Sequence, residues 1–209
     1  EPAQLDRHIK VESMTSEEIR RLRLCNVDLT ETFLPLNTFE EVLEHLKNKC
    51  ILNLDRSIKI LDDVMKIVNK HNMADQVLLK SDPSDASLKM VETFAPKVDY
   101  MPIFMEEDVA SEKIENMNIN YIGAELVFKS ESSSIAQDSY IDMMHKKGRI
   151  LWGNSIVYSS RVPLAAGHND DISLTGDPED GWGWLAKKGF DIIQTDWTHH
   201  CVNYLRNRY

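Results

Sequence analysis

Charged side chains stand where two apolar runs of this sequence end, and their types could bind or transform a substrate. Asp55 and Arg56 directly follow the apolar run at residues 50–54, and a helical pattern starts at once behind them. Lys80 lies at the end of a second apolar run, at residues 76–81. Polar groups delivered at the carboxyl end of a buried strand are typical of α/β proteins, which keep their chemistry there. Asp55 is therefore the first candidate for a functional residue.

Lys80 and Glu125 are charged residues in otherwise apolar runs. Lys80 could neutralise a phosphate group or form a Schiff base, whereas the simpler interpretation is a strand end that faces solvent. Glu125 interrupts the apolar run at residues 121–128. A carboxylate in a buried strand costs several kcal/mol unless it is paired or bound to a metal. The residue types alone leave open whether Glu125 lines a binding site or forms a structural ion pair.

Trp152 and Asn154 are two residues apart in the apolar run at residues 149–154. Alternate residues of a strand point to the same side, so both could face the interior end of a barrel. We predict that they bind substrate together with Lys80 and Glu125. Core packing of the tryptophan is the alternative.

Three further groups of residues have the composition of a site but a simpler structural interpretation. Residues 167–171 resemble a metal loop without a recognised ligand spacing, and we expect an exposed turn. We expect Trp182 and Trp184 to pack a helix against the sheet. Trp197, His199 and His200 follow the last strand, and we expect them in the first turn of a helix.

Helical patterns and short β-rich runs alternate along the chain about every 25 to 30 residues, which predicts six strands joined by crossovers long enough for parallel pairing. Capping residues at Thr15 and Thr38 predict two earlier helices, with a loop at residues 34–38 between them. The pattern favours either a doubly wound sheet or a (β/α)8 barrel. No glycine-rich phosphate loop follows any strand, which weighs against a nucleotide-binding sheet. The predicted strands begin near residues 50, 76, 98, 121, 149 and 190.

Composition limits the partners of the chain. Its 209 residues carry 24 basic and 34 acidic side chains, a net charge of -10, and no basic cluster longer than a pair. Nucleic acids and anionic membrane surfaces are therefore not expected as partners. No apolar run approaches the roughly 20 residues of a membrane span. The 3 cysteines indicate neither a disulfide framework nor a zinc motif.

Several segments resemble, in order, the glycerophosphodiester phosphodiesterase family. Single motifs are weak, but their succession at family-like spacing covers nearly the whole chain. Leu-Asp-Arg stands at residues 5–7, Met-Thr-Ser-Glu-Glu-Ile at 14–19, Leu-Pro-Leu-Asn-Thr-Phe-Glu-Glu at 34–41, Leu-Asn-Leu-Asp at 52–55, Lys-Gly-Arg-Ile-Leu-Trp-Gly-Asn at 147–154 and Gly-Phe-Asp-Ile-Ile-Gln-Thr-Asp at 189–196.

This resemblance implies one α/β domain over residues 1–209, an incomplete (β/α)8 TIM barrel with about six of its eight βα units. It also implies a metal-dependent hydrolase that splits a small-molecule glycerophosphodiester into glycerol 3-phosphate and an alcohol. The family's His-Arg-Gly, Glu-x-Asp and two acid–base histidines match nothing between Glu1 and Tyr209. We therefore expect them upstream, and expect these residues by themselves to be inactive.

The resemblance carries over to few residues. Asp55 falls where the family has its third metal-binding carboxylate, usually a glutamate, and its hard oxygen suits Ca²⁺ or Mg²⁺. Ser57 falls where the family usually has a phosphate-binding lysine, which puts phosphate contact from this strand in doubt. Trp152 falls where the family commonly has an aromatic residue at the mouth of the pocket.

Two other functions remain open. A barrel relative that has lost part of the site would be a non-catalytic module that binds a headgroup or a sugar, as the Ser57 departure allows. A third option is a Lys80-dependent aldolase-type barrel. In each case a barrel that lacks strands has unpaired edges, so we predict self-association of the isolated chain.

Overall fold

The computed structural model describes residues 10–26, 28–159 and 161–208. They belong to two compact units, the first from Glu1 to Cys50 and the second from Ile51 to Tyr209. Every predicted site residue lies in the second unit.

The first unit combines short helices with one β-hairpin. The side chains of Thr15 and Thr38 each accept a hydrogen bond from the backbone N–H three residues on, and the carboxylates of Glu18 and Glu41 accept one from the backbone N–H of the capping threonine. Both predicted helix starts are therefore confirmed, each as a capping box. The elements of this unit are a 3-10 helix Val11–Ser13, α1 Ser16–Arg21, β1 Arg23–Cys25, β2 Glu31–Pro35 and α2 Phe39–Leu46.

The β-hairpin was not predicted. β1 and β2 pair antiparallel, with Arg23 opposite Pro35 and Cys25 opposite Glu31. The prediction of a loop at residues 34–38 is wrong at its start, since β2 includes Leu34 and Pro35. Four of the five residues of β2 are exposed. A strand without a buried face lacks the alternation of apolar and polar residues by which strands are recognised.

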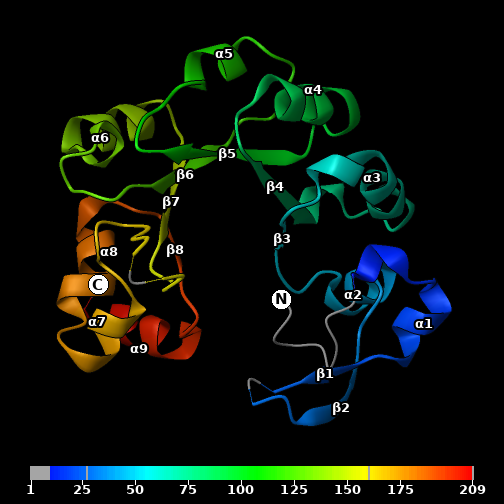
Figure 1. Cartoon of the computed structure of the whole chain (residues 1–209). Helices are drawn as coiled ribbons and strands as arrows, with labels where there is room; N and C mark the ends of the chain where they lie inside the picture. Colours follow the sequence, from blue (N-terminus) through cyan, green and yellow to red (C-terminus); the bar gives the residue numbers. More distant parts are fainter. Residues whose placement is uncertain (1–9, 27, 160, 209) are drawn as a thin grey trace. The chain divides into compact units, whose positions relative to one another are not determined.

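The second unit is built on a parallel sheet whose strand order follows the sequence, from β3 to β8. A doubly wound sheet would reverse its order at a switch point, whereas a barrel adds each strand beside the previous one. In Figure 1 the helices α3 to α6 lie outside the curve of these strands. This is the predicted (β/α)8 type with six βα units. The strands are β3 Leu52–Leu54, β4 Val77–Ser81, β5 Asp99–Met105, β6 Gly123–Val127, β7 Ile150–Asn154 and β8 Ile192–Gln194.

The helices of this unit follow the strands that the sequence alternation predicted. α7 is an addition, in a segment for which a turn was expected. The predicted helix at residues 178–188 is a π-helical turn, Glu179–Gly183, followed by α8, and Gly189 ends it with φ 101°. The helices are α3 Leu61–Lys70, α4 Asp85–Phe94, α5 Ser111–Glu115, α6 Asp138–Lys146, α7 Asp170–Thr175, α8 Trp184–Lys188 and α9 Thr198–Arg208.

The two faces of the sheet differ in chemistry. Leu79 pairs with Tyr100 and Phe104 with Leu126, and all four are fully buried apolar or aromatic residues of the core. The other face carries Glu125, which is the direct neighbour of Ile103 on β5 and Trp152 on β7. Strand alternation therefore places the core on one side and the predicted site residues on the other.

The edge strands of the sheet are β3 and β8. Within the described residues neither pairs with a further strand. Unpaired strand edges favour association with other chains, so self-association stays a prediction of this architecture.

Tyr100 makes the stability of this sheet sensitive to alkaline pH. Its hydroxyl shares a 2.9 Å hydrogen bond with Ser81 Oγ, and burial raises its pKa to about 12. A tyrosine of the unfolded chain titrates near 10, so the contribution of Tyr100 is complete below pH 10 and is lost as the pH rises to 12. We expect a loss of about 1.4 kcal/mol from this residue between pH 8 and pH 11. Urea unfolding at both pH values would measure it, and an equal loss in Tyr100→Phe would contradict the assignment.

Candidate functional site at the inner face of the sheet

Three of the predicted substrate-binding residues are joined by hydrogen bonds on the inner face. Lys80 Nζ lies 2.7 Å from Glu125 Oε2 in a buried ion pair, and Asn154 Nδ2 donates to Glu125 Oε1 over 3.0 Å. The three side chains come from β4, β6 and β7, and each residue is about 5% exposed or less. The simpler interpretation of Lys80, a strand end that faces solvent, is wrong because the side chain is buried. Glu125 is the link between the other two.

Trp152 completes this group. Lys80 Nζ lies 3.7 Å from the centroid of the tryptophan ring, a cation–π contact, and Trp152 Nε1 donates to Gln194 Oε1 over 3.0 Å. The structure thus brings all four predicted residues together. Gln194 was not singled out, although it is a polar residue in the last predicted strand and pairs in register with Asn154. We call Lys80, Glu125, Trp152, Asn154 and Gln194 the inner network.

The inner network presents one ammonium group. Lys80 Nζ has three protons, of which one is directed to the Glu125 carboxylate and the ring of Trp152 lies across another side. Glu125 has a partner on each oxygen, so it is an acceptor already in use. The arrangement can therefore orient Lys80 as a fixed hydrogen-bond donor toward an anionic group, with Trp152 as a flat apolar wall.

A cavity of about 410 Å³ adjoins Lys80 and includes Asp55. The predicted metal ligand and the predicted substrate-binding lysine therefore border one cavity. The Asp55 side chain is 65% exposed, and its oxygen lies 3.7 Å from Arg56 Nε. Arg56 has φ 53°, a left-handed conformation that turns the chain at the end of β3. The residues around this cavity are Asp55, Arg56, Ile58, Lys59, Lys80, Ser81, Asp82, Ser87 and Ile103.

Asp55 does not cap the helix that follows β3, although aspartate is common at such positions. That helix begins as a 3-10 turn at Ile58, and its capping position is Ser57, whose side chain makes no capping bond. Ser57 Oγ instead donates to the carbonyl oxygen of Leu54 over 2.8 Å. Ser57 is buried and closes the strand, so it does not replace the phosphate-binding lysine that the family resemblance implies.

Asp82 is a second carboxylate at this cavity, and sequence reasoning missed it. The backbone N–H of Ser84 donates to Asp82 Oδ1 over 3.0 Å, and Ser87 Oγ donates to Oδ2 over 3.1 Å. Hydrogen bonds from Ser84 lower the pKa of the Asp82 carboxyl, and the hydrogen bond from Ser87 lowers it further by a smaller amount. The charge of Asp82 is therefore used to hold the loop that starts α4. The sequence signal that could have indicated Asp82 is the nearby serine, Ser84, which caps the helix α4.

The described residues fit a divalent cation only in part. Asp55 offers a hard oxygen, but Ca²⁺ and Mg²⁺ take six or more ligands, usually with several carboxylates among them. Within the described part of the second unit, no three His, Cys, Asp or Glu side chains bring their ligand atoms close enough together to hold an ion. No catalytic step through a metal follows from these residues.

Asp170 corrects the expectation of an exposed turn at residues 167–171. It is 2% exposed, and its Oδ1 accepts hydrogen bonds from Ser155 Oγ at 2.6 Å, Trp182 Nε1 at 2.7 Å and Thr195 Oγ1 at 2.7 Å. Its Oδ2 accepts from the backbone N–H of Asp196 at 2.9 Å. The carboxylate therefore joins the ends of β7 and β8 to the π-helical turn. Four donors on one carboxylate compensate the cost of burying its charge.

The aromatic residues near Asp170 have structural roles. Trp182 is 2% exposed and packs as predicted. Trp184 stacks on His168, with ring centroids 3.8 Å apart. His168 Nε2 also lies 3.0 Å from Glu131 Oε1, which links the loop after β6 to the loop after β7. His199 and His200 lie in the first turn of α9 as expected, both exposed.

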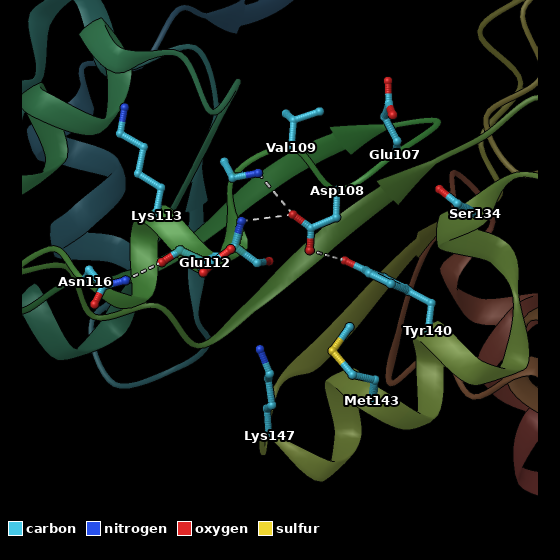
Figure 2. A pocket seen from close by; sticks show the side chains of 12 residues that line it. Glu107, Asp108, Val109, Glu112, Lys113, Asn116, Ser134, Tyr140, Met143 and Lys147 are labelled. Atoms are coloured by element: carbon cyan, nitrogen blue, oxygen red, sulfur yellow. Dashed lines mark hydrogen bonds between the residues drawn. The ribbon is translucent and has the colours of Figure 1, made fainter.

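A larger cavity, of about 750 Å³, lies on the helical side of the unit between α5 and α6 (Figure 2). Asp108 accepts hydrogen bonds there from the backbone of Ala110 and Ser111 and from the hydroxyl of Tyr140, at 2.8 to 3.1 Å. Burial raises the pKa of Tyr140, and the neighbouring Asp108 charge adds to it. Asp108 therefore ties two helices together, and no residue of the inner network borders this cavity.

Solved structures place this fold in a known class. A glycerophosphoryl diester phosphodiesterase from Parabacteroides distasonis ATCC 8503 matches 98% of this chain and 67% of its own, with 16% identity and a TM-score of 0.72. A protein described as a candidate glycerophosphodiester phosphodiesterase from Galdieria sulphuraria matches 99% and 78%, with 16% identity and a TM-score of 0.67. A glycerophosphodiester phosphodiesterase from Agrobacterium tumefaciens str. C58 matches 92% and 73%, with 14% identity and a TM-score of 0.62. The chain has the TIM-barrel fold of these proteins, so the resemblance read from its sequence is confirmed at the level of the fold.

The chain itself belongs to the family DUF4996, a domain of unknown function, whose model matches residues 100–205, just over half of the sequence. Among curated proteins no sequence matches it. None of the helices in the described ranges combines the length and the apolar character needed to cross a membrane.

Proposed function

We propose that the protein is a phosphoric diester hydrolase of the glycerophosphodiester phosphodiesterase type, with residues 1–209 in one barrel domain. The observation that carries the proposal is the inner network, in which side chains from β4, β6 and β7 meet beside the cavity of Asp55. The location supports the proposal, because active sites of TIM barrels lie at the carboxyl ends of the strands. The reaction class comes from the solved structures of the same fold, which are described as phosphodiesterases of this type.

The reaction is the addition of water across one phosphate ester bond. The water oxygen bonds to phosphorus, the bond from phosphorus to the alcohol oxygen breaks, and a water proton passes to that oxygen. The products are glycerol 3-phosphate and the alcohol. In this reaction Lys80 donates a hydrogen bond to the phosphodiester anion, Glu125 and Asn154 hold Lys80 in place, and Trp152 packs against the glycerol carbons.

The function is tested with the protein expressed from its complete reading frame. Release of glycerol 3-phosphate from glycerophosphocholine is followed with a coupled enzyme assay. We expect turnover in the wild type and at least a tenfold lower rate in Lys80→Arg. Arginine keeps the positive charge, but its planar guanidinium group cannot reproduce the contacts of the compact ammonium group with Glu125 and the Trp152 ring. Absence of turnover over a range of headgroups would contradict the proposal.

We further propose that Asp55 is a ligand of a divalent cation, as the family resemblance implies. A ligand that binds only the folded state stabilises it by about 2.7 kcal/mol when its concentration is a hundred times its dissociation constant. We expect Ca²⁺ or Mg²⁺ to raise the melting temperature of the wild type, EDTA to reverse the rise, and Asp55→Asn to abolish it. Asp75→Asn removes another exposed carboxylate and serves as the control. Equal shifts in both variants would disprove the role of Asp55.

A non-catalytic module that binds a headgroup or a sugar is the second candidate. It is favoured by one observation, the pairing of Lys80 with Glu125, which leaves the inner network without excess charge. Calorimetric binding of glycerophosphocholine without turnover would identify this function. The aldolase-type alternative gains no support, because a Schiff base needs an amine that is free to attack a carbonyl carbon, whereas Lys80 Nζ is held 2.7 Å from Glu125 Oε2 and 3.7 Å from the centroid of the Trp152 ring. Borohydride trapping on Lys80 would restore it.

A further inference from the structure

Gln194 is the member of the inner network that has no part in the proposed reaction. It lies in β8, in register with Asn154 on β7, and its side-chain oxygen accepts a hydrogen bond from Trp152 Nε1 over 3.0 Å. The indole N–H is a donor only, so the oxygen of the amide, and not its nitrogen, must face it. The orientation of the amide is therefore fixed, with its NH₂ group directed away from the indole nitrogen.

Every side-chain oxygen of the inner network already has a donor. Glu125 accepts from Lys80 on Oε2 and from Asn154 on Oε1. Asn154 Oδ1 in turn accepts from the backbone N–H of Ile156 over 3.4 Å, and the oxygen of Gln194 is used as well. Within the described residues, by contrast, the NH₂ group of Gln194 has no acceptor, and Lys80 uses one of its three protons. The inner network therefore offers donors, and a ligand must supply the acceptors.

The members of the inner network differ in their access to solvent. Lys80, Glu125 and Asn154 are each 5% exposed or less, whereas Trp152 and Gln194 are partly exposed. The NH₂ group of Gln194 is thus a donor that a ligand can use without breaking a hydrogen bond within the protein. Such a group contributes to affinity at little cost, because it exchanges only its bonds with water.

Gln194 and Lys80 contact the same indole ring. Lys80 Nζ lies 3.7 Å from the ring centroid, over the face of Trp152, and Gln194 lies at its nitrogen edge. A ligand in contact with this ring has a charged donor at the face and a neutral donor at the edge. We propose that Gln194 Nε2 donates a hydrogen bond to an oxygen of the glycerol 3-phosphate half of the substrate. This inference rests on the proposed function, in which that half packs against Trp152.

Two substitutions separate donation to the substrate from support of Trp152. Gln194→Glu keeps an oxygen for the indole N–H but has no N–H group, whereas Gln194→Met is neutral and loses both. With the protein from its complete reading frame, calorimetry measures binding of glycerol 3-phosphate, and the coupled assay gives KM and kcat for glycerophosphocholine. We expect roughly tenfold weaker binding and a roughly tenfold higher KM in both variants, with kcat nearly unchanged. Asn118→Asp, which adds the same charge at an exposed position between α5 and β6, should leave all three values unchanged.

A role of Gln194 in supporting Trp152 alone predicts a different pattern, in which Gln194→Glu behaves like the wild type and only Gln194→Met is impaired. That result would overturn the proposal. Wild-type values in both variants would overturn it too, and so would a loss in Gln194→Glu alone, which charge repulsion explains. If glycerol 3-phosphate binds and both variants weaken it without turnover of any substrate, the role of Gln194 is supported and the proposed function fails. Absence of glycerol 3-phosphate binding to the wild type would contradict the role of Gln194, with or without turnover.

A second comparison applies if Gln194→Met does not fold, because that variant leaves the indole N–H without an acceptor. The variant Trp152→Phe has no such N–H, and it is compared with the double variant Trp152→Phe, Gln194→Met. Weaker glycerol 3-phosphate binding in the double variant supports donation by Gln194, whereas equal affinities rule it out.

Discussion

Replacing Lys80 by methionine is expected to lower the free energy of unfolding by about 3–5 kcal/mol, because it leaves the Glu125 carboxylate buried without its counter-charge. Methionine fills nearly the same volume, so little of the loss comes from a void. Urea unfolding followed by circular dichroism would measure it. Lys66→Met is the control, since Lys66 is 63% exposed and solvent screens its ion pairs with Asp62 and Asp63.

A double variant separates charge burial from packing. Lys80→Met combined with Glu125→Met removes both charges and should recover at least half of the loss, since an apolar pair of similar volume replaces the ion pair. Recovery stays incomplete because Asn154 Nδ2 then lacks its acceptor. The loss in the double variant could instead equal the sum of the losses in Lys80→Met and Glu125→Met. That result would show that the two charges do not interact in solution.

Asp170→Asn is expected to cost about 3–5 kcal/mol, the second large effect. The carboxylate accepts from Ser155, Trp182 and Thr195 on one oxygen and from the backbone of Asp196 on the other. An amide has one acceptor oxygen, so its NH₂ group must face a donor in either orientation, and buried donors are left without a partner. Thermal and urea unfolding would measure the loss.

Asp171→Asn is the matched control for this variant. Asp171 is the neighbouring residue in α7 and is exposed, so its substitution should change the free energy of unfolding by less than about 0.5 kcal/mol. Cys201 gives a second measurement, because burial, with a further contribution from Asp170, raises the pKa of its thiol to about 11. Alkylation of Cys201 should become faster in Asp170→Asn. Equal unfolding energies for the two variants would show that Asp170 is not a structural centre.

The sequence predicted the sheet and four members of its inner network for one physical reason. Alternation of apolar strands and amphipathic helices fixes parallel strands, and charged or polar residues inside buried strands must face one another or a ligand. Lys80 and Glu125 are 45 residues apart, yet both interrupt apolar runs, so each indicated a partner that the structure supplies. Asn154 and Trp152 followed from their spacing of two.

Other features depend on contacts that no local pattern reveals. Asp170 stands in a run of small and polar residues, and only the approach of β8 and the π-helical turn buries it. Gln194 lies in a strand with partly exposed residues, so nothing local marks it as a partner of Trp152. The β-hairpin of the first unit has an exposed strand, and therefore lacks the periodicity from which strands are predicted.

The ion pair between Lys80 and Glu125 spans a strand, since β5 lies between β4 and β6. If β6 paired with β5 one residue out of register, its side chains would exchange faces and Glu125 would point away from Lys80. Such a misassembled sheet would bury two isolated charges, at a cost of several kcal/mol. The ion pair between Lys80 and Glu125 thus specifies the register of the sheet, because a slipped arrangement would be less stable than the native one.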